Sequence, residues 1–163
     1  MNIGLISDTH NYLHPHIFDH FKNVDQIWHA GDIGSLKVID ELEAFKATRV
    51  VYGNIDNGQI QNQYPEYQYF KINNVKFLII HIGGYPPRYN NRSKQLLDYY
   101  HPDIFICGHS HILKVVPDEK RNLLHLNPGA CGKYGWHKVK TIMRFEILDD
   151  KIDKLEVIEL SNL

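Results

Sequence analysis

Seven residues of metal-binding types stand at or just past the ends of five apolar runs in this chain. The runs cover residues 3–6, 26–30, 49–52, 75–80 and 103–107. The seven residues are Asp8, His10, Asp32, Asn54, His81, His109 and His111. Carboxylate, amide and imidazole ligands without a thiolate favour divalent manganese, iron, zinc or nickel over copper(I) or a structural zinc cluster. The set therefore outlines a site for two metal ions.

The apolar runs have the composition of buried β-strands. They are short, rich in β-branched and aromatic residues, and bounded by glycine or polar residues. Open α/β sheets place their chemistry outside the carboxyl ends of the strands. We therefore expect the metal-ligand candidates to gather along one edge of a sheet.

Two short motifs each contain a pair of ligand candidates. Asp8 and His10 are two residues apart, and so are His109 and His111. Residues two apart lie on the same side of an extended segment, so we expect each pair to reach an ion from extended backbone. The two remaining oxygen ligands, Asp32 and Asn54, each follow a glycine directly. Glycine frees the backbone at a strand end.

The N-terminal half of the chain alternates strands and helices. Helical patterns over residues 13–21 and 35–45 separate the first three apolar runs. This order predicts βαβ units and a parallel sheet. Ser35 precedes an apolar stripe at helical spacing, so we expect it to be the N-cap of the second helix.

The second half predicts antiparallel hairpins. The pair Asn73-Asn74 separates two apolar runs and tolerates the left-handed backbone of a tight turn. The expected hairpins pair residues 67–72 with 75–80, 112–116 with 123–126, and 141–148 with 152–160, and a helix is expected over 90–99. Parallel units followed by hairpins predict an α/β fold with two mixed sheets packed face to face and helices outside.

Length and composition predict a single soluble domain. A chain of this size buries about 68–70% of the surface that it exposes when unfolded. The formal net charge of -1 gives no attraction to nucleic acid or to an anionic membrane. The two cysteines lack a CxxC spacing, and the chain shows neither a leader pattern nor an apolar stretch long enough to span a membrane. We therefore expect a reduced, cytoplasmic protein.

The order of these motifs resembles the calcineurin-like metallophosphoesterases. The series is Asp8-Thr9-His10, Gly31-Asp32, Gly53-Asn54-Ile55-Asp56, His81 and Gly108-His109-Ser110-His111. The resemblance is strongest to the small, cap-less phosphodiesterases of the YfcE type, whose late Asn-Pro-Gly-Ser turn is similar to residues 127–130 here. It covers residues 1–163 as one domain and implies a four-layer α/β/β/α sandwich.

The resemblance also implies a division of the ligands and a reaction. One metal would be held by Asp8, His10 and His111, and a second by Asn54, His81 and His109, with Asp32 bridging the two. A hydroxide bridging two divalent ions, which we expect to be manganese, would attack a phosphate diester. Iron, zinc or nickel remain alternatives. Two ions can lower the pKa of a shared water to about 7 and stabilise the attacking and leaving oxygens.

Two positions depart from the pattern of larger relatives. Where those proteins have a histidine after the metal-binding asparagine, this chain has Ile55, which cannot carry a proton. Where many relatives read His-Gly-His, the residue two past His81 is Gly83. Arg88 lies in the Gly/Pro-rich stretch that follows, and we expect its guanidinium to contact the phosphate.

Three other functions are alternatives to a phosphodiesterase. A phosphomonoesterase would use the same ligands. A non-catalytic scaffold, similar to the retromer subunit of this fold, would use the domain as a binding surface, but that subunit has lost several ligands that are all present here. A nuclease of the double-strand-break-repair type would need DNA-contacting elements and a basic patch, for which this chain has no room. The substrate is expected to be a small phosphate ester, and a homo-oligomer remains open.

Several further residues near the motifs have two interpretations. His29 precedes the Gly31-Asp32 step and is either a partner of the ligands or a packed strand histidine. His137 lies in a Gly-rich stretch, where an ordinary loop histidine is favoured over one that overhangs the site. Tyr134 in the same stretch is expected to pack rather than to stack on a base.

Overall fold

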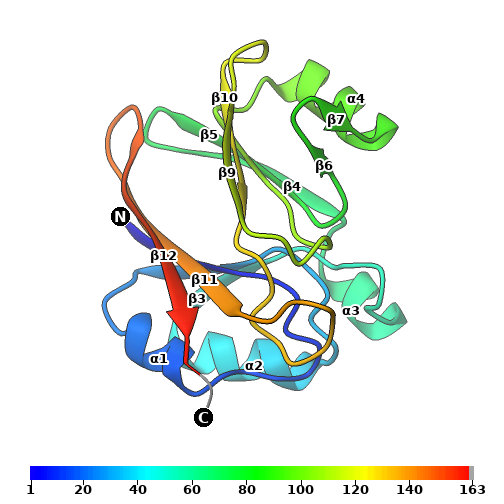
Figure 1. Ribbon diagram of the computed structural model, residues 1–163, viewed down its shortest axis with the longest axis vertical. Helices are drawn as coiled ribbons and strands as arrows, with labels where there is room; N and C mark the ends of the chain where they lie inside the picture. Colours follow the sequence, from blue (N-terminus) through cyan, green and yellow to red (C-terminus); the bar gives the residue numbers. More distant parts are fainter. Residues whose placement is uncertain (162–163) are drawn as a thin grey trace.

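Two five-stranded mixed sheets stacked face to face form the centre of the computed structural model, which describes residues 1–161 (Figure 1). The first sheet has the order β12 (Ile152–Leu160), β11 (Lys140–Ile147), β1 (Asn2–Ile6), β2 (Gln26–His29) and β3 (Ala47–Val50). Strands β1, β2 and β3 are parallel, β11 pairs antiparallel with β1, and β12 pairs antiparallel with β11. The N-terminal alternation of strands and helices therefore forms the parallel half of one sheet.

The second sheet repeats this mixture of strand directions. Its order is β4 (Tyr67–Ile72), β5 (Val75–Ile80), β8 (Ile104–Ile106), β10 (Leu123–Asn127) and β9 (Lys114–Asp118). The three inner strands are parallel, whereas β4 and β9 pair antiparallel at the edges. The three predicted hairpins are all present, with their ends shifted by one or two residues for the second and third.

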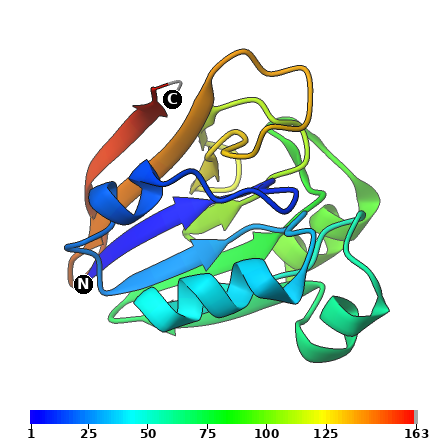
Figure 2. The ribbon, with the colours of Figure 1, turned by 90° about the horizontal axis from the view of Figure 1, so that it is seen from below.

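Helices cover both outer faces, which makes four layers. Helices α1 (His16–His20) and α2 (Leu36–Phe45) lie on the first sheet, as Figure 2 shows, and their buried residues share one apolar cluster with that sheet. Helix α4 (Asn91–Tyr100) packs on the second sheet through Leu96 and Leu97. The predicted α/β/β/α sandwich of two mixed sheets is confirmed.

The core between the two sheets is built around one tryptophan. Trp28 is fully buried and meets the rings of Phe77 and Phe145 edge to face, at 4.9 and 5.6 Å between centroids. Phe77 belongs to the second sheet and Phe145 to the first, so one side chain fills the space between the layers. Aromatic pairs in this geometry add about 0.5–1.5 kcal/mol beyond the area that they bury.

One predicted helix was wrong in its extent, and a few elements of the structure were not predicted. The helix expected over residues 13–21 is only His16–His20, because Pro15 cannot donate a backbone hydrogen bond and disfavours helical backbone at the residue before it. Ser35 occupies the predicted N-cap position of α2, but its side chain makes no capping hydrogen bond. Helix α3 (Gly58–Gln63) and the short hairpin β6 (Gly84–Tyr85) and β7 (Arg88–Tyr89) were not predicted.

The parallel strands of both sheets end on the same side of the molecule. Strands β1, β2 and β3 deliver the first ligand candidates there, and β5 and β8 deliver the others. The expectation of one sheet edge was therefore wrong in one respect, because the candidates meet where two stacked sheets end. No helix among the described residues is long and apolar enough to cross a membrane.

Candidate metal centre

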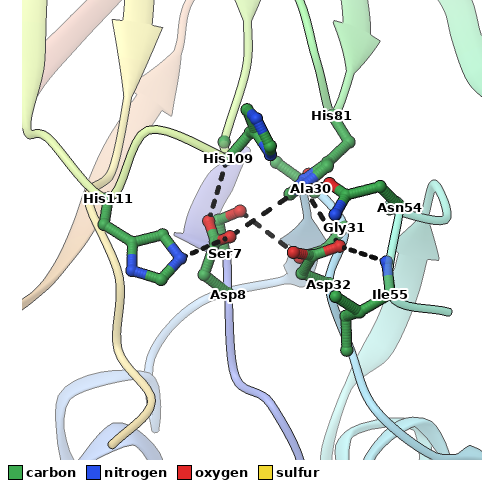
Figure 3. A network of polar contacts seen from close by, with 12 residues as sticks. Ser7, Asp8, Ala30, Gly31, Asp32, Asn54, Ile55, His81, His109 and His111 are labelled. Atoms are coloured by element: carbon green, nitrogen blue, oxygen red, sulfur yellow. Dashed lines mark hydrogen bonds and ion pairs between the residues drawn. The ribbon is translucent and has the colours of Figure 1, made fainter. Parts of the chain in front are cut away.

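The histidines and aspartates among the ligand candidates converge into two adjoining groups. Asp8, His10 and His111 form one group, and within it the possible ligand atoms all lie within 4.8 Å of one another. Asp32, His81 and His109 form the other by the same measure, and Figure 3 shows the two groups side by side. All six residues come from the loops that follow β1, β2, β5 and β8.

Asn54 completes the second group with a neutral oxygen. Its Oδ1 atom lies 3.1 Å from His81 Nε2, and the same nitrogen lies 3.1 Å from Asp32 Oδ1. Asn54 is exposed, whereas His81 and Asp32 are buried. The structure therefore brings all seven predicted residues to one place.

Asp32 is the residue that both groups share. Its Oδ1 lies 3.1 Å from His81 Nε2, and its Oδ2 lies 3.6 Å from His10 Nε2 in the other group. The backbone N–H of Ile55 donates to Asp32 Oδ1 at 3.1 Å and holds the carboxylate in place. Burial raises the pKa of Asp32, but the hydrogen bonds from His81 and Ile55 and the nearby imidazoles outweigh it and lower the pKa.

The backbone conformation of the ligand loops differs from the sequence prediction. Extended segments were expected, but five ligand candidates have left-handed backbone with φ angles of 44 to 66°: Asp8, His10, Asp32, His109 and His111. Each strand ends before its ligand, and the loop then turns sharply instead of continuing as a strand. Such backbone costs energy for residues other than glycine and is found where surrounding contacts enforce it, often at functional sites.

The contacts that enforce these turns join the loops to one another. The backbone N–H of Asp8 donates to Gly31 O at 2.9 Å, and that of His10 donates to Asp32 O at 3.1 Å. The N–H of His109 donates to Asp8 Oδ2 at 3.1 Å across the two sheets. Each loop is therefore held by a neighbouring loop that also supplies a ligand candidate.

His81 is oriented by a backbone carbonyl. Its Nδ1 lies 2.7 Å from Ala30 O, and since a carbonyl only accepts, Nδ1 must carry a hydrogen. Nε2 then faces Asp32 and Asn54, which is the orientation that a metal-binding histidine needs. Burial opposes the charge of His81, but its hydrogen bond to Asp32 and the charge of Asp8 prevail and raise its pKa.

His111 is oriented in the same way, through a second histidine. His137 Nε2 lies 3.0 Å from Gly132 O, so this nitrogen donates and a neutral His137 accepts at Nδ1. His111 Nδ1 lies 3.2 Å from His137 Nδ1 and must donate to it. The expectation of an ordinary loop histidine at 137 was wrong, because a contact 26 residues away along the chain decides the role of this side chain.

This hydrogen-bond assignment leaves room for a cation between His111 and Asp8. With its hydrogen on Nδ1, His111 turns an Nε2 lone pair toward Asp8 Oδ1 at 3.1 Å. In the described part of the chain, Asp8 Oδ1 and His10 Nε2 are buried without any hydrogen-bond partner. Facing lone pairs and unpartnered buried ligand atoms are costly unless a positive ion lies between them. The residues present therefore fit a divalent metal.

Three residues outside the ligand set hold its loops. Asp56 accepts from the backbone N–H groups of Ile33, Gly34 and Gly53 at 2.7 to 2.9 Å and so joins the loops after β2 and β3. Asn127 donates to Gly108 O at 2.8 Å and fixes the histidine loop. Both belong to motifs of the family pattern, and neither was predicted to hold the ligand loops.

His29 is the third of these residues, and it is both packed and hydrogen-bonded. Gly31 N–H donates to its Nδ1 at 3.1 Å, so its Nε2 carries the hydrogen and donates to Thr9 Oγ1 at 2.9 Å. Thr9 Oγ1 in turn donates to Ile33 O at 2.9 Å. Burial lowers the pKa of His29 to about 3, so the ring stays neutral. His29 therefore joins the loops that follow β1 and β2.

The structure also explains one of the two departures from the family pattern. A side chain at Gly83 would collide with Cys107 Sγ and the ring of Phe105, so there is no room for a histidine there. At the other departure, Ile55 contributes only its backbone N–H, and its side chain is 44% exposed. Arg88 lies on β7 opposite Tyr85, and its side chain is exposed. Its contact with phosphate stays a prediction.

Two hollows flank the centre. One, of about 620 Å³, is lined by His109, His111 and the loop of Tyr134 and Trp136. The other, of about 330 Å³, is lined on the opposite flank by Asn54 and His81 among others. In Figure 3, His111 and Asn54 stand on opposite sides of the two aspartates. A molecule bound at the centre can therefore extend in two directions.

The chain is similar to known metallophosphoesterases over nearly its whole length. A probable metallophosphoesterase of Methanocaldococcus jannaschii is 34% identical, and the match covers 98% of this chain and 82% of that protein. The solved structure of an archaeal phosphodiesterase has a TM-score of 0.76 at 27% identity, covering 98% of this chain and 100% of that one. Vps29 of Entamoeba histolytica, solved in complex with Zn²⁺, has a TM-score of 0.74 at 21% identity, covering 98% of each chain, and shares the fold.

The family itself follows from a match to most of the sequence. The model of the calcineurin-like phosphoesterase superfamily domain matches residues 1–150. This range contains every ligand candidate and all the loops that orient them. The chain belongs to the calcineurin-like phosphoesterase superfamily.

Proposed function

We propose that this protein is a two-metal phosphodiesterase. The observation that supports it best is the pair of adjoining ligand groups that share one buried carboxylate, Asp32. The similarity to an archaeal phosphodiesterase points in the same direction. Asp8, His10 and His111 would hold one ion, Asn54, His81 and His109 the other, and Asp32 both. The donors are oxygen and nitrogen only, which suits divalent manganese, iron, zinc or nickel, and of these we propose manganese as the metal.

The protein's own residues would position the ions and the substrate. Two divalent ions, when bound, supply Lewis acidity and activate a water as the nucleophile. The buried aspartates Asp8 and Asp32 offset only part of the charge of two dications, which leaves the centre attractive to an anionic phosphate ester. Ile55 occupies the place of a proton donor in larger relatives, so the side chain there donates nothing to the leaving group.

The two flanking hollows support a diester over a monoester. A diester carries two substituents on its phosphorus, whereas a monoester carries one. With the phosphate at the centre, one substituent would extend past His109 and His111, and the other past Asn54 and His81. A monoester would leave one hollow without a function in the reaction.

A direct assay tests the proposal. The purified protein, loaded with manganese, should release p-nitrophenol from bis(p-nitrophenyl) phosphate faster than from p-nitrophenyl phosphate. Asp98→Asn, at an exposed aspartate paired with Arg121 on the surface, serves as the matched control for Asp32→Asn. Faster turnover of the monoester would favour a phosphomonoesterase. The absence of any metal-dependent turnover would favour a scaffold of the same fold.

A further inference from the structure

The loop over the larger hollow exposes aromatic side chains to solvent beside the metal centre. Trp136 is 101% exposed and Tyr134 is 70% exposed. Ile112, next to the ligand candidate His111, is 57% exposed and lines the same hollow. Burying a large apolar side chain is favourable. Three such side chains exposed to solvent around one concave surface are therefore typical of a binding site.

This loop is attached to the ligand candidates themselves. The ring of Tyr134 lies 5.0 Å from the ring of His10, tilted by 36°. His137 holds His111 through the hydrogen bond between their Nδ1 atoms. A side chain at Gly135 would collide with His111, so the loop backbone lies directly on this imidazole. The loop therefore holds Tyr134 and Trp136 next to the place where the phosphate would bind. Figure 2 shows the segment that precedes β11 curving over the ends of the strands.

The opposite hollow has a different character. It is lined by Glu66 and Arg92, whose side chains form an ion pair of 3.0 Å, as well as by Asn54 and Asn90. The hollow beneath the loop contains no carboxylate, lysine or arginine among its lining residues. The two hollows are therefore suited to different substituents, and only the first offers aromatic faces next to the ligand candidates.

We propose that the hollow between the histidine loop and residues 134–137 binds a planar aromatic ring attached to the phosphate ester, such as an aryl group or a nucleobase. The inference rests on the proposed phosphodiesterase function and names the substrate class for that site. A flat ring can pack against Trp136 and Tyr134 while its phosphate remains at the metal centre. The size of the hollow, about 620 Å³, suits a small ring system.

Physical arguments favour a ring over other substituents. Stacking on aromatic side chains is strong and tolerant of the identity of the ring. The lining offers few charged partners for a sugar phosphate or a cationic headgroup. Ser110 and His137 at the edge of the hollow supply hydrogen-bonding atoms for ring substituents.

Two phosphonates that differ only in the ring test the inference. Phenylphosphonate and methylphosphonate would both place a phosphonate at the manganese-loaded centre, and neither can be hydrolysed. Calorimetric titration should show phenylphosphonate binding about tenfold more tightly. In Trp136→Ala this preference should shrink toward one, with little change for methylphosphonate, and Tyr134→Ala should shrink the preference as well. Tyr99→Ala, at an aromatic residue that is 77% exposed on α4, is the matched control and should keep the full preference.

Fluorescence gives a second readout that does not depend on activity. The chain has two tryptophans, of which Trp28 is fully buried and Trp136 fully exposed. Acrylamide should therefore quench Trp136 almost alone, and phenylphosphonate should protect it whereas methylphosphonate should not. Trp136→Ala should lose the quenchable component.

Each outcome decides the proposal. Equal affinity for the two phosphonates, or a preference that survives both alanine substitutions, would overturn it. Protection of Trp136 that grows with protein concentration in the absence of a phosphonate would also overturn it, because the aromatic patch would then be a contact between copies. Hydrolysis of diesters without a ring preference would leave the proposed function standing and remove this assignment. A ring preference without any hydrolysis would support this assignment and remove the proposed function.

Discussion

The two halves of the candidate metal centre are held in place by different means. In the sheet-anchored half, defined as Asp32, Asn54, His81 and His109, the His81 ring is fixed by the carbonyl of Ala30 directly after β2, and its side chain is 2% exposed. In the loop-anchored half, defined as Asp8, His10 and His111, the His111 ring is fixed by His137 from a surface loop, and its side chain is 16% exposed.

This difference shows where the centre is rigid and where it is adjustable. The carbonyl of Ala30 follows a strand whose neighbours pair with it on both sides, so it cannot move without disturbing the sheet. His137 depends on a hydrogen bond to Gly132 O and on its contact with His111. Because the same loop bears Tyr134 and Trp136, a molecule bound in the adjoining hollow contacts the loop that orients His111.

The largest effect is expected at the residue that both halves share. Asp32→Asn removes the negative charge between His10 and His81 and should reduce kcat by about 10³-fold or more, because the proposed bridging carboxylate is lost. Turnover of bis(p-nitrophenyl) phosphate and metal content by elemental analysis would check this. Asp98→Asn should change neither quantity. Full activity with two bound ions in Asp32→Asn would show that the halves do not depend on a common carboxylate.

The next effect should fall on the sheet-anchored half. Gly31 has a φ of 98°, and an added Cβ would lie 2.6 Å from His81 Nδ1. Gly31→Ala should therefore displace the His81 ring and lower the free energy of unfolding by about 1–3 kcal/mol. Urea denaturation measures the stability, and turnover should fall together with it.

A second glycine gives the matched control for this change. Gly58 lies in α3, and a Cβ added there meets nothing within 4 Å. Gly58→Ala should raise the free energy of unfolding by about 0.4–1 kcal/mol, since alanine restricts the unfolded chain. If both alanine variants behaved alike, the close approach between Gly31 and His81 would not be what fixes the sheet-anchored half.

A smaller and more selective effect is expected in the loop-anchored half. His137→Ala removes the acceptor that sets the tautomer of His111, and loss of such a partner typically weakens metal binding 10- to 100-fold. One ion per chain should therefore bind more weakly while the other is retained, and the melting temperature should hardly change. Metal titration followed by calorimetry distinguishes the two sites. His101→Asn, at an exposed helix end with left-handed backbone, is the control. Equal weakening of both ions would contradict the comparison.

The elements of the fold could be predicted because their signals are local. Strand composition, the Asn73-Asn74 turn and helical spacing each lie within a few residues, and the strands and hairpins form where these patterns indicate. Helix α3 was missed because it has only six residues, although Asn57 caps it by accepting from the N–H groups of Gln59 and Ile60. Short helices give too little periodicity to detect.

The loop geometry could not be predicted because distant contacts impose it. Nothing within Gly108-His109-Ser110-His111 favours left-handed histidines, whereas the hydrogen bond from His109 N–H to Asp8 spans 101 residues. The pairing of His111 with His137 is equally invisible in the sequence. The motif order was therefore enough to predict which residues come together, but not the orientation of each ring.

The smallest effect at neutral pH is expected outside both halves, at His125. This histidine is fully buried in β10 beside Phe105, and burial lowers its pKa from 6.5 to about 4. Between these two pKa values, His125 is protonated in the unfolded chain but not in the folded chain. It should therefore destabilise the fold progressively as the pH falls from 6.5 toward 4.

The free energy of unfolding should therefore fall by roughly 3 kcal/mol less over this acid range in His125→Leu than in the wild type, while activity at neutral pH stays unchanged. Urea denaturation at a series of pH values would measure the difference between variant and wild type. His101→Asn again serves as the control and should keep the wild-type pH dependence. Loss of metal or activity at neutral pH in His125→Leu would show that the interior of the second sheet also holds the centre in place. The division of the centre into a sheet-anchored and a loop-anchored half would then be too simple.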